Sequence, residues 1–395
     1  MDKKIRLRLI GVGTMGSVYV QYLLQGDCPD FILAAVSDIN IARKDWVDAQ
    51  TDAHSHPPVA FFTDAKQMLQ SGLIDACIVS GLHYDHPCFA IDCFENNIHV
   101  LLEKPAGVYP LQVREMNEVA QKHPELVFGM MLNRRTEGVY RFLYDLMHSG
   151  KYGELRRMNW VVTTYYRPQA YFDSSDWRAT WAGEGGGVLL NQCAHHLDLL
   201  QWIFDMPIMV HAKLRYGMWH DIEVEDEASV YMEFKNGATG LFITSTGEAH
   251  GTDRLEIQLD RAKIVLEDGN LTVLEYEMSE QEFSASAQAA FSALKAERIE
   301  PVIPEDLNQH RAIIDAFGKA IKKEGKPIAD GLEGYRSVLL LAGIYLSDWL
   351  GREITFPYEE QLQYRLLSEK IAHSKKKTTG KTVIMDVTTS FKGVK

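Results

Sequence analysis

A short glycine motif near the start of this 395-residue chain limits its fold more than any other feature. The motif is GVGTMG at Gly11–Gly16, between an apolar stretch (IRLRLI) and a stretch with helical spacing (MGSVYVQYLLQ). Glycines spaced as GxGxxG permit a tight turn and let backbone N–H groups approach a pyrophosphate at a helix N-terminus. We therefore predict a dinucleotide site here, in preference to an ordinary glycine-rich turn. The residues expected to contact the dinucleotide are Gly11, Gly13, Thr14, Met15 and Gly16.

An acidic residue strengthens this prediction and bears on the choice of cofactor. Asp38 ends the next apolar stretch, 22 residues after Gly16, where a carboxylate accepts hydrogen bonds from the adenosine ribose. The same carboxylate would repel the 2′-phosphate of NADP, although Arg43 follows shortly and would relieve that repulsion. We expect NAD, with NADP left open.

The order of apolar patterns indicates two domains. Residues 1–131 alternate short β-rich runs with helical stretches, which predicts a doubly wound parallel sheet with helices on both faces. Residues 132–372 contain several alternating strands with hairpin signals at Asn236-Gly237 and Asp268-Gly269. This second part is therefore predicted to be an α+β domain with a large, mostly antiparallel sheet.

Charge and cysteine usage exclude several classes of protein. The net charge of −13 argues against a general nucleic-acid or anionic-membrane binder. One exception is a basic tail at 373–395, with six Lys and one Asp. The five cysteines form no CxxC pair, which argues against a disulfide framework and favours the cytoplasm.

The sequence Glu103-Lys104-Pro105 closes the fifth predicted strand. Ligands of open α/β sheets bind beyond the carboxyl ends of the strands, so Glu103 and Lys104 are expected at the cofactor crevice. A lysine there can bind a substrate hydroxyl, or carry a proton if burial lowers its pKa. A solvated surface lysine is an equal alternative from spacing alone.

The stretch GGGVLLNQCAHHLD at 185–198 places polar residues on a predicted helix. Asn191, His195 and Asp198 would share one helix face, where His195 could exchange a proton with a hydroxyl near neutral pH. Asn191 could orient His195 or bind a second hydroxyl, and Asp198 could support a ring nitrogen or the helix itself. A helix whose histidine bonds to a core carbonyl is the equal alternative.

Aromatic and basic residues before that helix suit a sugar or polyol. The candidates are Tyr165, Tyr166, Arg167, Trp177 and Arg178. A metal site is disfavoured, because the adjacent residues His195 and His196 diverge by about 100° on a helix. His83-Tyr-Asp-His86 is a second histidine pair, at the expected loop after the fourth strand.

Three pieces of the chain resemble the Gfo/Idh/MocA family of NAD(P)-dependent oxidoreductases. They are GVGTMG with Asp38, HVLLEKPAG, and WRATWAGEGGGVLLNQCAHHLDLLQWIF. The resemblance implies a Rossmann domain followed by an open sheet that often mediates homodimers or homotetramers. It also implies that Lys104 lies near the nicotinamide, that His195 is the proton acceptor and that His86 lies near the cofactor. Asn191 stands where relatives often have Asp, and a carboxylate there would raise the basicity of the histidine.

The resemblance predicts hydride transfer between the nicotinamide and a secondary alcohol carbon of a sugar, glycoside or inositol. His195, assisted by Lys104, would remove the hydroxyl proton. Two alternatives stay open: a redox-neutral glycoside-processing enzyme with tightly bound NAD, and a non-catalytic NAD-binding sensor of the same fold.

Overall fold

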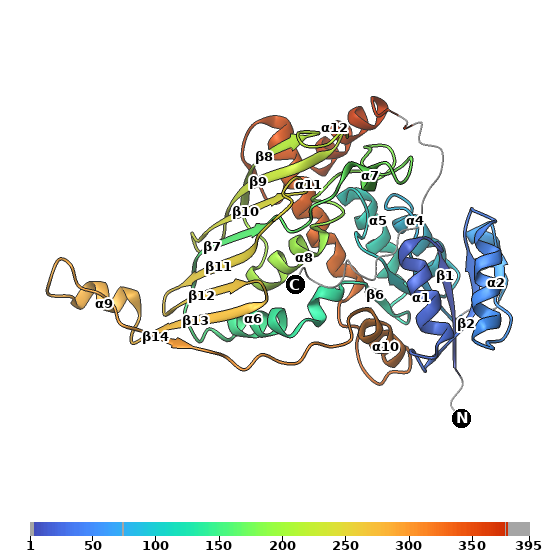
Figure 1. Ribbon diagram of the computed structural model, residues 1–395, viewed down its shortest axis with the longest axis horizontal. Helices are drawn as coiled ribbons and strands as arrows, with labels where there is room; N and C mark the ends of the chain where they lie inside the picture. Colours follow the sequence, from blue (N-terminus) through green and yellow to red (C-terminus); the bar gives the residue numbers. More distant parts are fainter. Residues whose placement is uncertain (1–3, 73–74, 376, 378–395) are drawn as a thin grey trace.

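Two β-sheets organise the structure, a computed structural model that describes residues 4–72, 75–375 and 377 (Figure 1). One sheet has six strands and the other has nine. Most positions of the basic tail at 373–395 lie outside the described residues. No helix in the described ranges combines the length and the apolar character that crossing a membrane requires.

The first sheet is entirely parallel, in the order β3-β2-β1-β4-β5-β6. Its strands are β1 (Ile5–Ile10), β2 (Phe31–Ser37), β3 (Ala60–Phe62), β4 (Ala76–Val79), β5 (His99–Leu102) and β6 (Phe128–Met130). Its connecting helices are α1 (Thr14–Leu24), α2 (Arg43–Ala53), α3 (Ala65–Leu69), α4 (His86–Glu95) and α5 (Pro110–Ala120). This architecture confirms the predicted doubly wound sheet.

Side chains alternate between the two faces of this sheet because successive strand residues point in opposite directions. Leu7 and Leu9 of β1 belong to one core, whereas Ile10 belongs to the core on the other face. The first core also contains Ile313 and Phe317 of α10 (Gln309–Ile321). The chain thus returns to the first sheet between β14 and β15 of the second sheet, while the domain boundary at 131/132 stays a prediction.

The second sheet has the order β14-β13-β12-β11-β7-β10-β9-β8-β15. Its strands are β7 (Leu155–Val162), β8 (Met209–Tyr216), β9 (Glu225–Glu233), β10 (Thr239–Ser245), β11 (Asp253–Leu259), β12 (Ala262–Glu267), β13 (Asn270–Tyr276), β14 (Ala296–Ile299) and β15 (Ile354–Thr355). All its pairings are antiparallel except β7 with β10. The prediction of a mostly antiparallel sheet is confirmed.

Both predicted hairpins are present. Asn236-Gly237 joins β9 to β10 and Asp268-Gly269 joins β12 to β13. Gly237 and Gly269 have φ values of +82° and +78°, the left-handed region that glycine adopts without a steric penalty.

Helices cover one face of the second sheet and leave the other open (Figure 1). The covering helices include α6 (Gly138–Ser149), α8 (Ala194–Phe204) and α11 (Gly334–Leu350). Buried Trp160 of β7 and Phe242 of β10 pack in one core with Leu143, Leu197 and Leu341 from these helices. The remaining helical elements of this half are α7 (Gln169–Phe172), α9 (Glu280–Ser286), α12 (Glu360–Ala372) and the 3₁₀ turns η1 (Asn133–Thr136) and η2 (Gly331–Glu333).

Candidate active site

A cavity of about 2140 Å³ is lined by the carboxyl ends of the first sheet's strands and by the loops before α8. Of the candidate residues predicted from the sequence, all line it except Gly16 and Asp198. The lining residues among those predictions are Gly11, Gly13, Thr14, Met15, Asp38, His83, His86, Glu103, Lys104, Tyr165, Tyr166, Arg167, Trp177, Arg178, Asn191 and His195. Residues from both domains therefore face one space.

The three glycines of the motif have different surroundings. A Cβ on Gly16 would lie 1.9 Å from the Gly11 carbonyl oxygen, and one on Gly11 would lie 2.3 Å from the Ser80 oxygen. A Cβ on Gly13 would meet nothing within 4 Å, because this residue faces the open cavity. Gly11 and Gly16 thus allow close packing of turn, strand and helix, and the space beside Gly13 at the start of α1 fits a pyrophosphate.

Asp38 and Arg43 lie together at the other side of this loop. Asp38 accepts hydrogen bonds from the backbone N–H groups of Val12 and Asn40, both at 2.8 Å. Arg43 donates to the Val12 carbonyl at 2.9 Å and to Ser17 Oγ at 2.7 Å. The glycine turn is therefore fixed by one carboxylate and one guanidinium, and both line the cavity.

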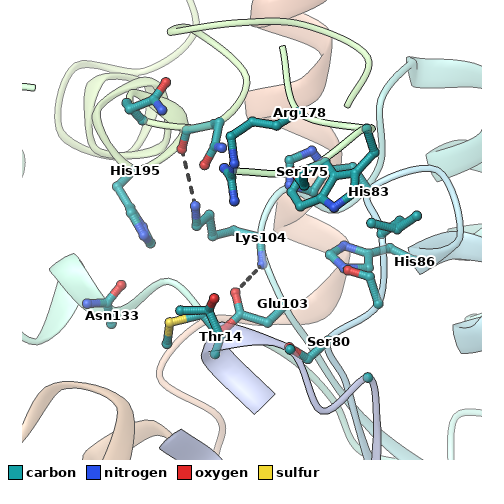
Figure 2. Close-up of a pocket in the computed structure, with 18 of the residues that line it drawn as sticks. Thr14, Ser80, His83, His86, Glu103, Lys104, Asn133, Ser175, Arg178 and His195 are labelled. Atoms are coloured by element: carbon teal, nitrogen blue, oxygen red, sulfur yellow. Dashed lines mark hydrogen bonds between the residues drawn. The ribbon is translucent and has the colours of Figure 1, made fainter. Parts of the chain in front are cut away.

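Glu103 and Lys104 extend from the end of β5 into the middle of the cavity (Figure 2). The buried Glu103 carboxylate accepts hydrogen bonds from Tyr19 Oη and from the Lys104 backbone N–H, the latter at 2.9 Å. The Lys104–Pro105 peptide bond is cis. Because Lys104 lines the cavity, the alternative of a solvated surface lysine is excluded.

The Lys104 ammonium group bridges the two domains by donating to the Asn191 carbonyl oxygen at 3.2 Å (Figure 2). Burial lowers the pKa of Lys104, while the nearby carboxylates of Glu103 and Glu184 oppose that shift. A lysine with a lowered pKa can donate a hydrogen bond and also exchange a proton closer to neutral pH.

His195 lies on the first turn of α8 and faces Lys104 across the cavity (Figure 2). Burial lowers the pKa of His195 well below 6.5, and the charges of Lys104 and Arg134 lower it further. Its Nδ1 atom has no hydrogen-bond partner among the described residues. The ring is therefore neutral at physiological pH.

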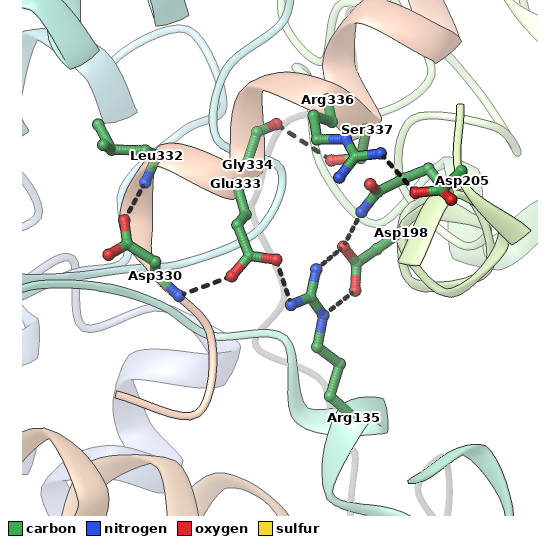
Figure 3. Close-up of polar contacts among 10 residues, drawn as sticks. Arg135, Asp198, Asp205, Asp330, Leu332, Glu333, Gly334, Arg336 and Ser337 are labelled. Carbon is green, nitrogen blue, oxygen red and sulfur yellow. Dashed lines mark hydrogen bonds and ion pairs between the residues drawn. The ribbon is translucent and has the colours of Figure 1, made fainter. Parts of the chain in front are cut away.

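The prediction that Asn191 shares a helix face with His195 and Asp198 is wrong. Helix α8 begins at Ala194, so Asn191 lies in the turn before it, where its Nδ2 donates to Glu184 and to Tyr171 Oη and makes no hydrogen bond to His195 among the described residues. Asp198 lies one turn further along α8, buried and outside the cavity wall, where Arg135 donates to its two oxygens at 2.7 and 2.8 Å (Figure 3). Asp198 therefore supports the helix and not the histidine ring.

The aromatic and basic residues predicted to bind a substrate line the cavity around Tyr171. The Arg178 guanidinium lies 4.4 Å from the centre of the Tyr171 ring and 4.5 Å from that of Trp177. It donates to Tyr171 Oη at 2.7 Å, while its Nε has no partner among the described residues. Arg167 lies over the Tyr171 ring at 5.1 Å, and Tyr166 is 43% exposed. This part of the cavity offers donors and flat apolar rings together.

His86 and His83 connect the loop after β4 to the rest of the site. The buried His86 ring lies 2.7 Å from the Pro105 carbonyl and 3.1 Å from the Gly81 carbonyl. Burial lowers the pKa of His86 to about 4. His83 Nδ1 lies 3.1 Å from the Glu184 carbonyl. No group of three or more metal-ligating side chains in the described ranges could hold an ion.

Sequence reasoning missed several residues of the cavity wall, among them Tyr171, Asn133, Arg134 and His310. Asn133 and Arg134 follow β6 in η1, and His310 lies on the first turn of α10. The first two lie at the carboxyl end of a parallel strand, so the rule that located Lys104 could also have found them. His310 reaches the cavity because α10 packs against the first sheet, and no local sequence pattern predicts that packing.

The fold and the site define a class, the NAD-binding Rossmann oxidoreductases with a second, substrate-facing domain. Two family models match the chain: the GFO/IDH/MocA oxidoreductase family with an NAD-binding Rossmann fold at residues 5–130, and a GFO/IDH/MocA C-terminal domain at residues 140–265. The chain belongs to the GFO/IDH/MocA family.

Two similar curated proteins are the myo-inositol 2-dehydrogenase of Thermotoga maritima and the D-glucoside 3-dehydrogenase of Escherichia coli. The first is 22% identical over 85% of this chain and 94% of its own length. The second is 24% identical over 89% of this chain and 97% of its own length. A similar solved structure is the WlbA dehydrogenase of Chromobacterium violaceum in complex with NADH and UDP-GlcNAcA. It has a TM-score of 0.76 and 24% identity, and covers 91% of this chain and 98% of its own.

Proposed function

We propose that this protein oxidises a secondary alcohol of a neutral sugar, glycoside or inositol to a ketone, or catalyses the reverse reduction, with NAD as its preferred cofactor. The observation that carries this proposal is that Lys104 and His195, from different domains, face one cavity that begins at the glycine motif. The relatives named for inositol and glucoside oxidation support the substrate class.

The proposed roles follow from the charges of the two side chains. Bound NAD supplies the hydride acceptor, at C4 of its nicotinamide. Neutral His195 accepts the proton of the substrate hydroxyl, and the Lys104 ammonium group donates a hydrogen bond to the same oxygen. The lysine thereby stabilises the negative charge that develops on this oxygen as the hydride leaves carbon. Glu103 holds the backbone of Lys104 in place.

The preference for NAD rests on Asp38, whose carboxylate can accept hydrogen bonds from a ribose and repels a phosphate. We also propose that the open face of the second sheet, which exposes Leu241, forms a homodimer or homotetramer contact, and that the protein is cytoplasmic. Light scattering of the purified protein and cell fractionation test these two points.

Absorbance at 340 nm tests the main proposal. Purified protein is mixed with NAD or NADP and a panel of sugars, glycosides and inositols. Growth of the signal with NAD and a narrow set of substrates is the expected result. A flat trace with every substrate overturns the dehydrogenase. Conversion of panel compounds without net formation of NADH would favour the redox-neutral glycoside-processing enzyme. No conversion at all, with NAD still bound to the protein, would favour the non-catalytic sensor.

A further inference from the structure

Glu184 is a buried carboxylate that lies behind the cavity wall, in contact with Asn191, and the proposed reaction does not use it. It is 2% exposed and precedes the three glycines at 185–187. Burial raises the pKa of Glu184, and the nearby Arg178 guanidinium opposes this shift. A buried acid with several donors directed at it is held in one orientation, so its contacts fix the groups around it.

The two oxygens of Glu184 have different partners. Oε2 accepts a hydrogen bond from the Ala179 backbone N–H at 2.5 Å, and Oε1 accepts one from Asn191 Nδ2. Arg178 Nη1 lies 3.7 Å from Oε1. The carboxylate therefore joins the loop that carries Arg178 to the turn that carries Asn191.

An ionised carboxylate can only accept hydrogen bonds, and this decides how the Asn191 amide is oriented. The NH₂ group must face Glu184, and it also lies 3.4 Å from Tyr171 Oη. Asn191 Oδ1 is then the atom of this side chain left without a hydrogen-bond partner among the described residues, and Asn191 lines the cavity. The amide therefore offers the cavity an acceptor.

We propose that Glu184 is a positioning residue that orients the Asn191 amide, so that Asn191 Oδ1 accepts a hydrogen bond from a substrate hydroxyl. This inference rests on the proposed polyol substrate and adds to it. An amide oxygen binds a hydroxyl, which donates, and rejects a carboxylate, which cannot donate. Glu184 thus selects a neutral polyol group at this position through Asn191.

A charge swap between positions 184 and 191 tests the inference. In Glu184→Gln, the new side-chain oxygen is needed by the Ala179 N–H, so its NH₂ group faces the NH₂ group of Asn191. Asn191 then turns its amide and presents a donor to the substrate. We expect KM for the substrate to rise about tenfold, with kcat changed less, since a lost hydrogen bond of about 1.4 kcal/mol corresponds to that factor.

Asn191→Asp should also raise KM, because it places two carboxylates against each other. The double variant Glu184→Gln/Asn191→Asp restores the hydrogen bond in the opposite direction and leaves one carboxylate oxygen facing the cavity. Its KM should return to within about threefold of the wild-type value, which a purely structural role of Glu184 would not produce. Glu223→Gln is the matched control: Glu223 accepts from the nearby Trp181 N–H at 2.6 Å without contacting Asn191, so its KM should not change.

A wild-type KM in Glu184→Gln overturns the inference, as does a double variant no better than the worse single variant. The single variant Glu184→Gln could fail to fold, which thermal unfolding and NADH fluorescence would detect. In that case the comparison of KM between Asn191→Asp and the double variant still tests the inference. The proposed function fails separately, when the wild-type protein reduces no NAD with any member of the panel.

Discussion

At the cofactor end of the cavity, the groups placed to touch a ligand are backbone N–H groups, one open glycine position and the Asp38 carboxylate. At the proposed substrate end, they are the side chains of Tyr171, Arg178 and Asn191, brought together from turns and short helices. The first arrangement depends on spacing within one strand–turn–helix unit. The second depends on hydrogen bonds between residues that no single element holds, such as Glu184 with Ala179 and Asn191. This difference predicts that the cofactor end tolerates few substitutions that change the shape of its turn. The proposed substrate end tolerates few substitutions that change its side-chain hydrogen bonds.

The largest effect should come from the point where the two ends meet. His195→Ala should lower kcat at least about 10²-fold, the usual size of a lost acid–base contribution. It should alter the thermal unfolding midpoint little, because Nδ1 of His195 has no partner among the described residues. Steady-state kinetics and thermal unfolding measure the two quantities.

His196→Ala is the control at the next position. Its ring is fully buried, with Nε2 2.7 Å from Arg134 Nη1 and its centroid 5.1 Å from that of Trp160. This variant should lose more stability and less kcat than His195→Ala. Equal losses of kcat in both would contradict the separate roles given to the two faces of α8.

The second-largest effect should be a loss of folding stability, with little change in the catalytic rate. Asp198→Asn should lower the free energy of unfolding by about 3 kcal/mol, because it leaves the buried Arg135 guanidinium with one fewer charge partner (Figure 3). Chemical denaturation measures this loss, and kcat of the folded fraction should remain near the wild-type value.

Asp205→Asn removes the carboxylate of a pair that is also shown in Figure 3. Asp205 is 75% exposed and 3.4 Å from Arg336, so its loss should change stability by less than about 1 kcal/mol. A large fall of kcat in Asp198→Asn with unchanged stability would return Asp198 to the catalytic face that the sequence predicted for it.

The sequence predicted the two ends of the cavity unequally, and the reason is the same contrast between local spacing and hydrogen bonds made only on folding. GVGTMG, Asp38 and Lys104 could be placed because strand ends and glycine spacing are local properties. The start of α8 could not, because the buried Glu225 carboxylate of β9 accepts N–H groups of Gly187 and Leu189, each at 3.0 Å. That distant partner holds the segment before Ala194 as turns, although its pattern suits a helix. The role of Glu184 could not be predicted from the sequence for the same reason, because it depends on residues that only folding brings close.

The third effect is a displacement of the pH profile. The Lys104 charge lowers the pKa of His195, so Lys104→Met should raise it. Alcohol oxidation requires neutral His195, which is present above its pKa and lost as the pH falls through it. The acidic limb of kcat/KM should therefore lie at higher pH in Lys104→Met than in the wild type. Lys122→Met, an exposed lysine away from the cavity, should leave the limb in place. A limb at unchanged or lower pH in Lys104→Met would mean that His195 is not the base.

The smallest effect tests the cofactor end. Asp38→Asn keeps an oxygen for the Val12 N–H but removes the charge, so KM for NAD should rise about tenfold, as expected for one lost charge-assisted hydrogen bond. KM for NADP should fall, because the repulsion of the 2′-phosphate disappears and Arg43 lies beside the same loop. Adding Arg43→Met to Asp38→Asn should abolish the gain with NADP while leaving KM for the sugar unchanged. If KM for the sugar moved with KM for the cofactor, the two ends would be coupled through the loop, and the contrast between shape and hydrogen bonding would not hold.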